Sequence, residues 1–183
     1  MRRLIASEMV SVDGFFSGPN GEVDWFVQSE DLEEFAQHLI DSVDTILYGR
    51  VTYQMMVGYW PHASGRFADR TNRLPKLVFS STLDETPWGD WDNARPVRGA
   101  LADEVAKLKS EPGRDIVIYG SGSVVQALTR LGAIDEYRLV VNPVVLSSGR
   151  PLFDGIPVRR KLRLTESVRW PSGCVALTYQ PSR

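Results

Sequence analysis

The feature that most restricts the fold of this chain is the alternation of short apolar runs with segments of helical periodicity. Residues 3–10, 45–48, 76–81, 115–119 and 137–141 are such runs, each bounded by turn residues or by a helical pattern, as expected of strands. A strand followed by a helix and another strand is the unit of a parallel sheet that carries helices on its faces. The sequence therefore predicts an α/β fold.

The segment after the first strand carries the clearest helical pattern. Ser29 is a suitable N-cap, and Glu30 and Asp31 follow it where the helix dipole favours anions. Apolar residues then recur on one helical face, which predicts an amphipathic helix: they are Leu32, Phe35, Ala36, Leu39, Ile40 and Val43. We predict further helices at 51–57, 100–110 and 124–131, the last closed by Gly132 as a C-terminal cap.

The C-terminal part of the chain has a different character. Two long strands, near 161–168 and 174–180, are predicted to pair as a hairpin. Residues 58–73 are expected to be irregular and exposed, and Trp88 is expected to pack at the surface. The prediction for the whole chain, residues 1–183, is one domain: a three-layer α/β/α sandwich with a mainly parallel central sheet and an antiparallel C-terminal edge.

Composition excludes several classes of function. The 21 Lys and Arg residues against 23 Asp and Glu give a net charge of −2, so no nucleic-acid partner is expected. One cysteine, Cys174, and two histidines argue against a zinc or iron–sulfur site, and we expect no metal. No apolar stretch approaches the about 18 residues of a membrane span. We expect a soluble, cytoplasmic protein with no membrane partner.

Three of the predicted strands end in glycine or small polar residues directly before a helix or loop. Ligands of open α/β sheets bind at the carboxyl ends of strands, where helix starts offer free N–H groups, and glycine lets the backbone approach a phosphate. Each turn alone has a structural explanation, but the convergence of all three favours a nucleotide or dinucleotide ligand. The candidate residues are Gly49, Arg50, Val51, Thr52, Ser80, Ser81, Thr82, Gly120, Ser121, Gly122, Ser123 and Val124.

A second group of residues is a candidate for the substrate side. Asp31 lies at the flank of the apolar stripe of its helix, where its carboxylate either faces a cleft or only complements the helix dipole. Asp13 precedes Gly14 and either forms a turn or contacts a ligand. Trp25 lies in an aromatic pair that either packs in the core or stacks on a flat ring.

These segments resemble the dihydrofolate reductase-like superfamily, and most closely the C-terminal reductase domain of riboflavin biosynthesis. The resemblance covers nearly the whole chain. Its matching segments are Ser11-Val12-Asp13-Gly14, Tyr48-Gly49-Arg50-Val51-Thr52-Tyr53, Phe79-Ser80-Ser81-Thr82, Gly120-Ser121-Gly122-Ser123, Asp135-Glu136-Tyr137-Arg138-Leu139, and residues 143–153.

The resemblance implies an enzyme, with NADPH as cofactor and a small heterocycle as substrate. It places the phosphates and the adenosine end of NADPH on the turns at 49–52 and 80–82, and the pyrophosphate and nicotinamide against 120–123. It gives Asp31 the role of the catalytic acid and places Asp13, Trp25, Asp31 and Phe35 at the substrate. It also implies a homodimer. The reaction would be hydride transfer to a C=N bond of a pterin-like or pyrimidine-like ring. The alternative is a non-catalytic nucleotide-binding or interaction protein that retains the fold.

Overall fold

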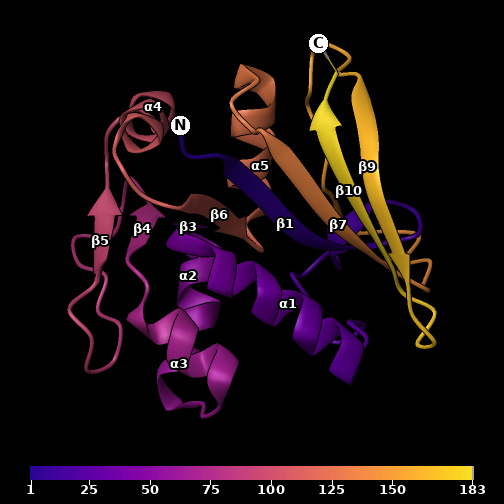
Figure 1. Ribbon diagram of the computed structural model, residues 1–183, viewed down its shortest axis with the longest axis horizontal. Helices are drawn as coiled ribbons and strands as arrows, with labels where there is room; N and C mark the ends of the chain where they lie inside the picture. The colour runs from indigo at the N-terminus through magenta and orange to yellow at the C-terminus, as the bar shows by residue number, and fades with distance from the viewer. Residues whose placement is uncertain (183) are drawn as a thin grey trace.

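The computed structural model describes residues 1–182 and is built around one eight-stranded sheet (Figure 1). Its strand order is β5-β4-β3-β6-β1-β7-β10-β9. All pairs from β5 to β7 are parallel, whereas β10 is antiparallel to both of its neighbours. The strands are β1 Leu4–Ser11, β3 Val43–Gly49, β4 Lys76–Phe79, β5 Ala94–Val97, β6 Asp115–Tyr119, β7 Glu136–Asn142, β9 Leu162–Arg169 and β10 Val175–Pro181.

Helices cover both faces of the sheet and complete the predicted three layers (Figure 1). One face carries α1 (Glu30–Ser42), α2 (Arg50–Val57) and α3 (Arg66–Arg73), whereas α4 (Leu101–Ser110) and α5 (Gly122–Leu131) lie on the other. The N-cap at Ser29 is confirmed, because its hydroxyl accepts a hydrogen bond from the N–H of Leu32. The C-terminal cap of α5 is confirmed as well, because Gly132 is left-handed, with φ 67°.

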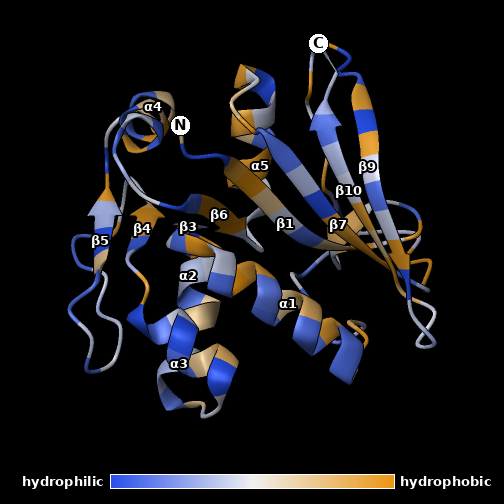
Figure 2. Ribbon diagram, in the orientation of Figure 1, coloured by the Kyte–Doolittle hydropathy of each residue, from blue (hydrophilic) through white to orange (hydrophobic). Residues whose placement is uncertain are grey.

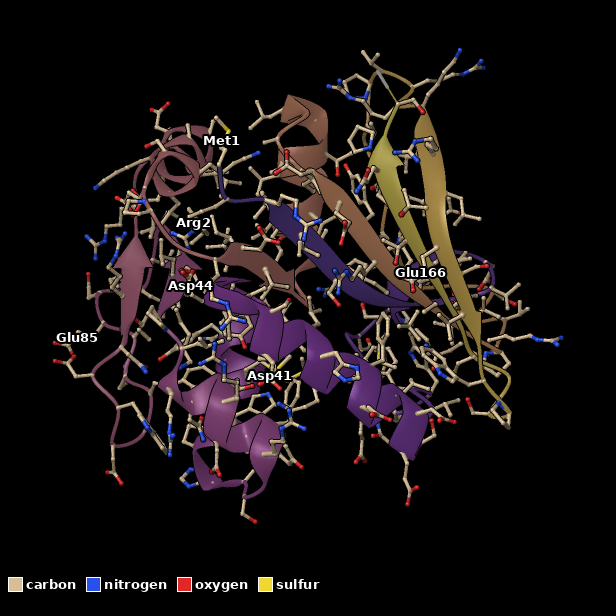
Figure 3. The ribbon with its side chains drawn as sticks, viewed as in Figure 1. Met1, Arg2, Asp41, Asp44, Glu85 and Glu166 are labelled. Atoms are coloured by element: carbon tan, nitrogen blue, oxygen red, sulfur yellow. The ribbon has the colours of Figure 1, made fainter. Side chains whose placement is uncertain are left out.

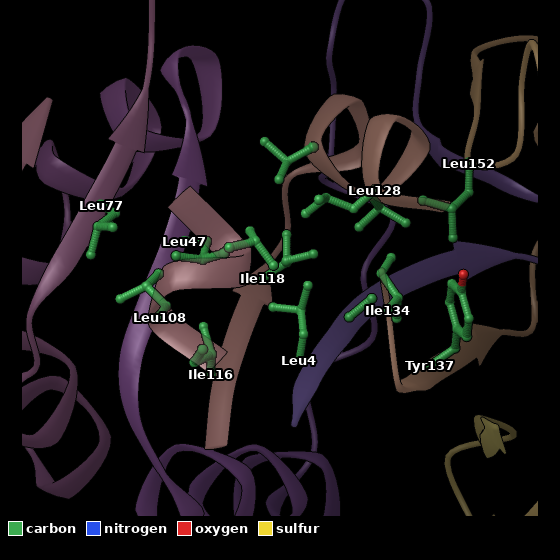
Figure 4. Packing of buried hydrophobic residues seen from close by; sticks show 14 of the residues in the cluster. Leu4, Leu47, Leu77, Leu108, Ile116, Ile118, Leu128, Ile134, Tyr137 and Leu152 are labelled. Atoms are coloured by element: carbon green, nitrogen blue, oxygen red, sulfur yellow. The ribbon is translucent and has the colours of Figure 1, made fainter. Parts of the chain in front are cut away.

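The strands divide their apolar side chains between two cores. Along β1, Leu4, Ala6 and Val10 pack toward α4 and α5, whereas Ile5 packs toward α1 and α2. This alternation follows from the period of two in a strand. Figure 4 shows the first core, in which Leu4 and Leu128 lie close to the strands of the sheet. In Figure 2 the apolar colour is concentrated in the central strands, which both helix layers cover.

A third apolar cluster lies beneath the start of α1. Leu32 and Phe35 pack there with Val140 of β7 and Cys174. The ring of Phe35 meets Trp170 edge-on, with centroids 5.4 Å apart. Cys174 is fully buried. The cluster therefore fixes the first turn of α1 over the C-terminal part of the sheet.

Two predictions for the polar middle of the chain were wrong. Residues 58–73 are not irregular, because they include a 3-10 turn, η1 (Trp60–His62), and the helix α3. Trp88 is not at the surface: it is fully buried, lies parallel to Tyr48 with centroids 5.9 Å apart, and donates its indole N–H to Asn72 at 2.8 Å. The bond to Asn72 satisfies the one polar group of the indole, which removes the cost of burying it.

The C-terminal hairpin is confirmed and leaves one side of β9 open. β9 pairs with β10 and is the last strand of the sheet. Leu164 of β9 is 48% exposed, and Val158 and Phe153 before it are also exposed. A short second sheet joins β2 (Phe15–Ser17) to β8 (Arg150–Pro151). No helix within residues 1–182 is both long and apolar enough to cross a membrane.

Candidate functional site

The three turns predicted to bind a nucleotide lie at one edge of the sheet. They follow β4, β3 and β6, which are neighbours in the sheet and run parallel. Parallel strands end at the same edge, so Ser80, Gly49 and Gly120 come together there although they are far apart in sequence. This is the edge at which open α/β sheets bind ligands.

The turns after β3 and β6 are joined by direct hydrogen bonds. The backbone N–H of Gly49 donates to Oγ of Ser121 at 3.0 Å, and Oγ1 of Thr52 donates to the carbonyl of Gly120 at 2.8 Å. These bonds hold the starts of α2 and α5 side by side. Neither helix has a side-chain cap at its start. The N–H of Val124 donates to the carbonyl of Ser121 at 2.9 Å, but no side chain caps the first turn of either helix, and both helix dipoles favour an anion there.

Glycine is required at two of these positions for different reasons. Gly120 has φ +66°, in the left-handed region that side chains disfavour. Gly122 has no room for a side chain, because a Cβ there would lie 2.5 Å from Cζ of Phe16. The ring of Phe16, in β2, thus rests directly on the first residue of α5. Gly120 is therefore needed for the backbone conformation of the turn, and Gly122 for its packing against β2.

The remaining residues of the cofactor prediction differ in what they offer. Arg50 is exposed, and its guanidinium donates to Oε1 of Gln54 at 3.5 Å, so its charge is available to a ligand. Oγ of Ser80 already accepts from the N–H groups of Thr82 and Leu83, at 3.1 and 3.0 Å. Ser80 therefore shapes its turn, and its hydroxyl also shares a hydrogen bond with that of Thr82 at 3.3 Å. Ser81 and Thr82 are exposed and present their hydroxyls at the surface.

The substrate-side residues do not form one compact group. Asp31 is exposed in the first turn of α1, beside the buried Leu32. Phe35 packs on Trp170, as described above. Trp25 donates its indole N–H to the carbonyl of Glu22 at 3.2 Å and meets Phe26 edge-on. Asp31 is thus accessible to a ligand, whereas Phe35 and Trp25 already have partners within the chain.

Asp13 is held by the backbone of a distant loop. Its carboxylate accepts from the hydroxyl of Ser11 at 2.6 Å and from the N–H groups of Leu146 and Ser147 at 3.1 and 2.8 Å. These bonds lower the pKa of Asp13, and the bond from Ser11 is the largest cause. Ser147 adopts φ 63° there. In this structure, then, Asp13 ties the end of β1 to the loop after β7.

Glu8 was not among the candidate residues predicted from the sequence. Its side chain is 4% exposed, and burial raises the pKa of the carboxyl to about 8, against a smaller opposing effect of the Ser121 N–H. Oε1 has no hydrogen-bond partner in the part of the chain that the structure describes. A signal was present in the sequence, because Glu8 is the one charged residue within the apolar run 4–10.

Ion pairs gather at the opposite, amino-terminal end of the strands. Arg2 pairs with Asp44 and donates to Oγ1 of Thr45 at 2.8 Å, and Figure 3 shows Arg2 and Asp44 at that end. Arg3 pairs with Asp115 and Glu136. Among residues 1–182, no three His, Cys, Asp or Glu side chains are placed to hold a metal. The site at the carboxyl edge is therefore built from backbone N–H groups, hydroxyls and Arg50.

The fold is an α/β fold of the dihydrofolate reductase-like class. Its sheet is mainly parallel, and the starts of α2 and α5 lie together at the carboxyl edge. Residues 2–176 match the model of the RibD C-terminal domain, and the chain belongs to that family. The uncharacterized protein YyaP of Bacillus subtilis is 36% identical, covering 97% of this chain and 94% of the relative.

Solved structures share the fold at low sequence identity. A protein of Shewanella sp. PV-4 described as a "Putative riboflavin biosynthesis protein" superposes with a TM-score of 0.83 at 24% identity, over 99% of both chains. Dihydrofolate reductase from Enterococcus faecalis, in complex with NADP(H), superposes with a TM-score of 0.68 at 15% identity, over 99% of this chain and 97% of that one. The likeness confirms the predicted fold, which reductases of this class share.

The contact between Gly122 and Phe16 leads to a stability prediction. Gly122→Ala should destabilise the protein by about 1–3 kcal/mol, because the new methyl group overlaps the Phe16 ring and the turn must shift. Urea denaturation measures this change. Gly99→Ala is the matched control, since a Cβ at Gly99 meets nothing within 4 Å. Adding Phe16→Leu should restore part of the loss; a Gly122→Ala protein as stable as the wild type would contradict the packing argument.

Proposed function

We propose that this protein is an NADPH-dependent reductase that transfers a hydride to a C=N bond of a pterin-like or pyrimidine-like ring. The observation that carries the proposal is the joined pair of uncapped helix starts at Gly49 and Ser121. Two such starts present converging N–H groups and partial positive charge, which suits the pyrophosphate of a dinucleotide. Membership of the RibD C-terminal domain family and the likeness to an NADP(H)-bound reductase agree with it.

The residues at the carboxyl edge fit the parts of NADPH. The α5 start, residues 120–124, would bind the pyrophosphate through backbone N–H groups, and Gly120 gives the turn its left-handed conformation. Arg50 would bind the 2′-phosphate of the adenosine, with Ser81 and Thr82 as hydroxyl donors. Bound NADPH would supply the hydride. The residues of the chain would hold the cofactor against the substrate ring in the orientation for hydride transfer and would exclude water.

The substrate is proposed to lie on the α1 side of the sheet, where Asp31 is exposed. A carboxylate there suits a protonated or amidine-like heterocycle and is accessible for proton transfer. The competing proposal is a non-catalytic protein that binds the nucleotide at the same turns. Both bind NADPH, so the two proposals separate only at the substrate end.

The first functional prediction concerns cofactor choice. The wild type should bind NADPH more tightly than NADH, and Arg50→Ala should weaken NADPH binding by about 10- to 150-fold, because a charge-assisted contact to a phosphate contributes about 1.5–3 kcal/mol. NADH affinity should barely change. Titration of nucleotide fluorescence measures both affinities. Arg73→Ala, which removes an exposed arginine of α3, is the control; equal loss of NADPH and NADH affinity in Arg50→Ala would refute the assignment.

The second functional prediction concerns Asp31. Asp31→Asn should lower kcat/KM by about 10²- to 10⁴-fold, the usual contribution of a positioned acid or base, and leave NADPH affinity unchanged. The substrate for the assay is chosen by a thermal-shift panel of folates and flavin precursors with NADPH present. Glu33→Gln is the matched control, because Glu33 is also acidic and exposed in the first turn of α1. Full activity of Asp31→Asn would remove Asp31 from the mechanism.

A third proposal is that the protein is a homodimer assembled through the open side of β9. An edge strand with unpaired backbone groups and exposed Leu164 is suited to pairing with a second copy. Light scattering at micromolar concentration should give twice the mass of the chain, and Leu164→Glu should shift the protein toward the monomer. A wild-type monomer under these conditions would overturn the proposal.

A further inference from the structure

Glu8 lies directly beneath the first turn of α5. The side chains of Leu4, Ala6 and Val10 pack toward α4 and α5, and strand alternation places Glu8 in the same row. The pairing of β1 with β6 ends at Ser7 and Tyr119, and the N–H of Gly120 then donates to the carbonyl of Ser7 at 3.2 Å. Glu8 is the next residue of β1 and lies beside the turn. The backbone N–H of Ser121, in that turn, lowers the pKa of its carboxyl through a hydrogen bond, against the larger effect of burial.

A comparison with the buried Glu136 shows what Glu8 lacks. Glu136 is 3% exposed, and its carboxylate accepts from Arg3 at 3.0 Å and from Nε of Arg138 at 2.8 Å. Glu8 is buried to the same degree, yet within residues 1–182 it forms no ion pair and its Oε1 is unpartnered. An isolated buried carboxylate is costly, and the protonated acid is the form that burial favours. The pKa of Glu8 is accordingly raised to about 8.

The charged groups around Glu8 do not offset its charge. On β6, the pKa of Tyr119 is raised to about 12 by burial and, to a lesser extent, by the charge of Glu8. On β7, Arg138 is already bound to Glu136. The first ionisable residue of α5 is Arg130, near its far end, which donates to the carbonyl of Gly155. β2 contributes Phe15–Ser17, without an ionisable side chain.

We propose that Glu8 is a positioning residue that couples binding of an anionic ligand at the α5 start to its own protonation. The inference rests on the proposed function, since the ligand is the pyrophosphate of the dinucleotide. A Glu8 carboxylate competes for the Ser121 N–H and adds a negative charge under the turn that the anion must occupy. A neutral Glu8 removes that repulsion and leaves the N–H to the ligand.

The coupling predicts the direction in which the affinity for NADPH changes with pH and the pH range of that change. Below about pH 8, Glu8 is protonated in both the free and the bound protein, so affinity should not change with pH. Above about pH 8, the free protein has lost the proton and binding must take it up again. The affinity for NADPH should then fall by up to about tenfold per pH unit, the limit for uptake of one proton.

The test measures NADPH binding by titration calorimetry from pH 6.5 to 9.5, in buffers of different ionisation enthalpy that reveal proton uptake. The wild type should take up about one proton above pH 8, and Glu8→Gln should bind with an affinity independent of pH. Glu136→Gln is the matched control and should keep the wild-type pH dependence. A flat wild-type profile, or a Glu8→Gln profile with the wild-type slope, would overturn the proposal.

A second measurement keeps the proposal testable if Glu8→Gln does not fold or if the wild type does not bind NADPH. Carbon-13 NMR of the Glu8 carboxyl in the wild type follows its titration directly, with and without inorganic pyrophosphate. We expect a midpoint near pH 8 that rises when pyrophosphate is added. A midpoint in the ordinary range of glutamate, or one that pyrophosphate leaves unchanged, overturns the role of Glu8. Failure of NADPH binding alone, with the NMR shift present, overturns only the choice of dinucleotide.

Discussion

The site depends on the hydrogen bond from the N–H of Gly49 to Oγ of Ser121. It joins two turns that lie 72 residues apart in sequence and belong to helices on opposite faces of the sheet. Because the Ser121 hydroxyl accepts from a neighbouring strand end, it does not cap its own helix, and the first N–H groups of α5 stay free. One interaction therefore both aligns the two helix starts and leaves their donors available.

Charged side chains are distributed differently at the two ends of the strands. At the amino-terminal end of the strands, Arg2 and Arg3 form ion pairs with Asp44, Asp115 and Glu136. These pairs join β3, β6 and β7 to the segment before β1. At the carboxyl edge lie Arg50 and backbone N–H groups instead, with the exposed hydroxyls of Ser81 and Thr82. The sheet is thus anchored at one end by paired charges and left open to an anion at the other, where helix dipoles set the potential.

Much of the fold could be predicted because periodicity is strong where side chains meet the sheet. The bounds of β1, α1 and β3 were predicted to within a few residues, since Leu39 and Ile40 must face the strands. The short strands β2 and β5 were not predicted. The helix α3 could not be predicted in this way, because it contains Phe67 and Ala68 but is otherwise polar. It is held instead by Arg70, which donates to the carbonyls of Ile40 and Val43, and such long-range bonds leave no periodic signal.

Long-range contacts leave no local signal in the sequence, and this also explains which residues of the candidate site could be predicted. Glycines and hydroxyls at strand ends mark a turn locally, so Gly49, Gly120 and Ser121 could be identified from their neighbours in sequence. For Glu8 the sequence signal is only its charge within an apolar run. Its proposed role arises from what the fold places beside it, the turn after β6 and the start of α5. A charged residue in the row of Leu4, Ala6 and Val10 breaks the local rule for a buried strand. A buried charged residue whose charge no ion pair balances is expected at a functional or strained site, because a sequence that only stabilised the fold would place an apolar residue there.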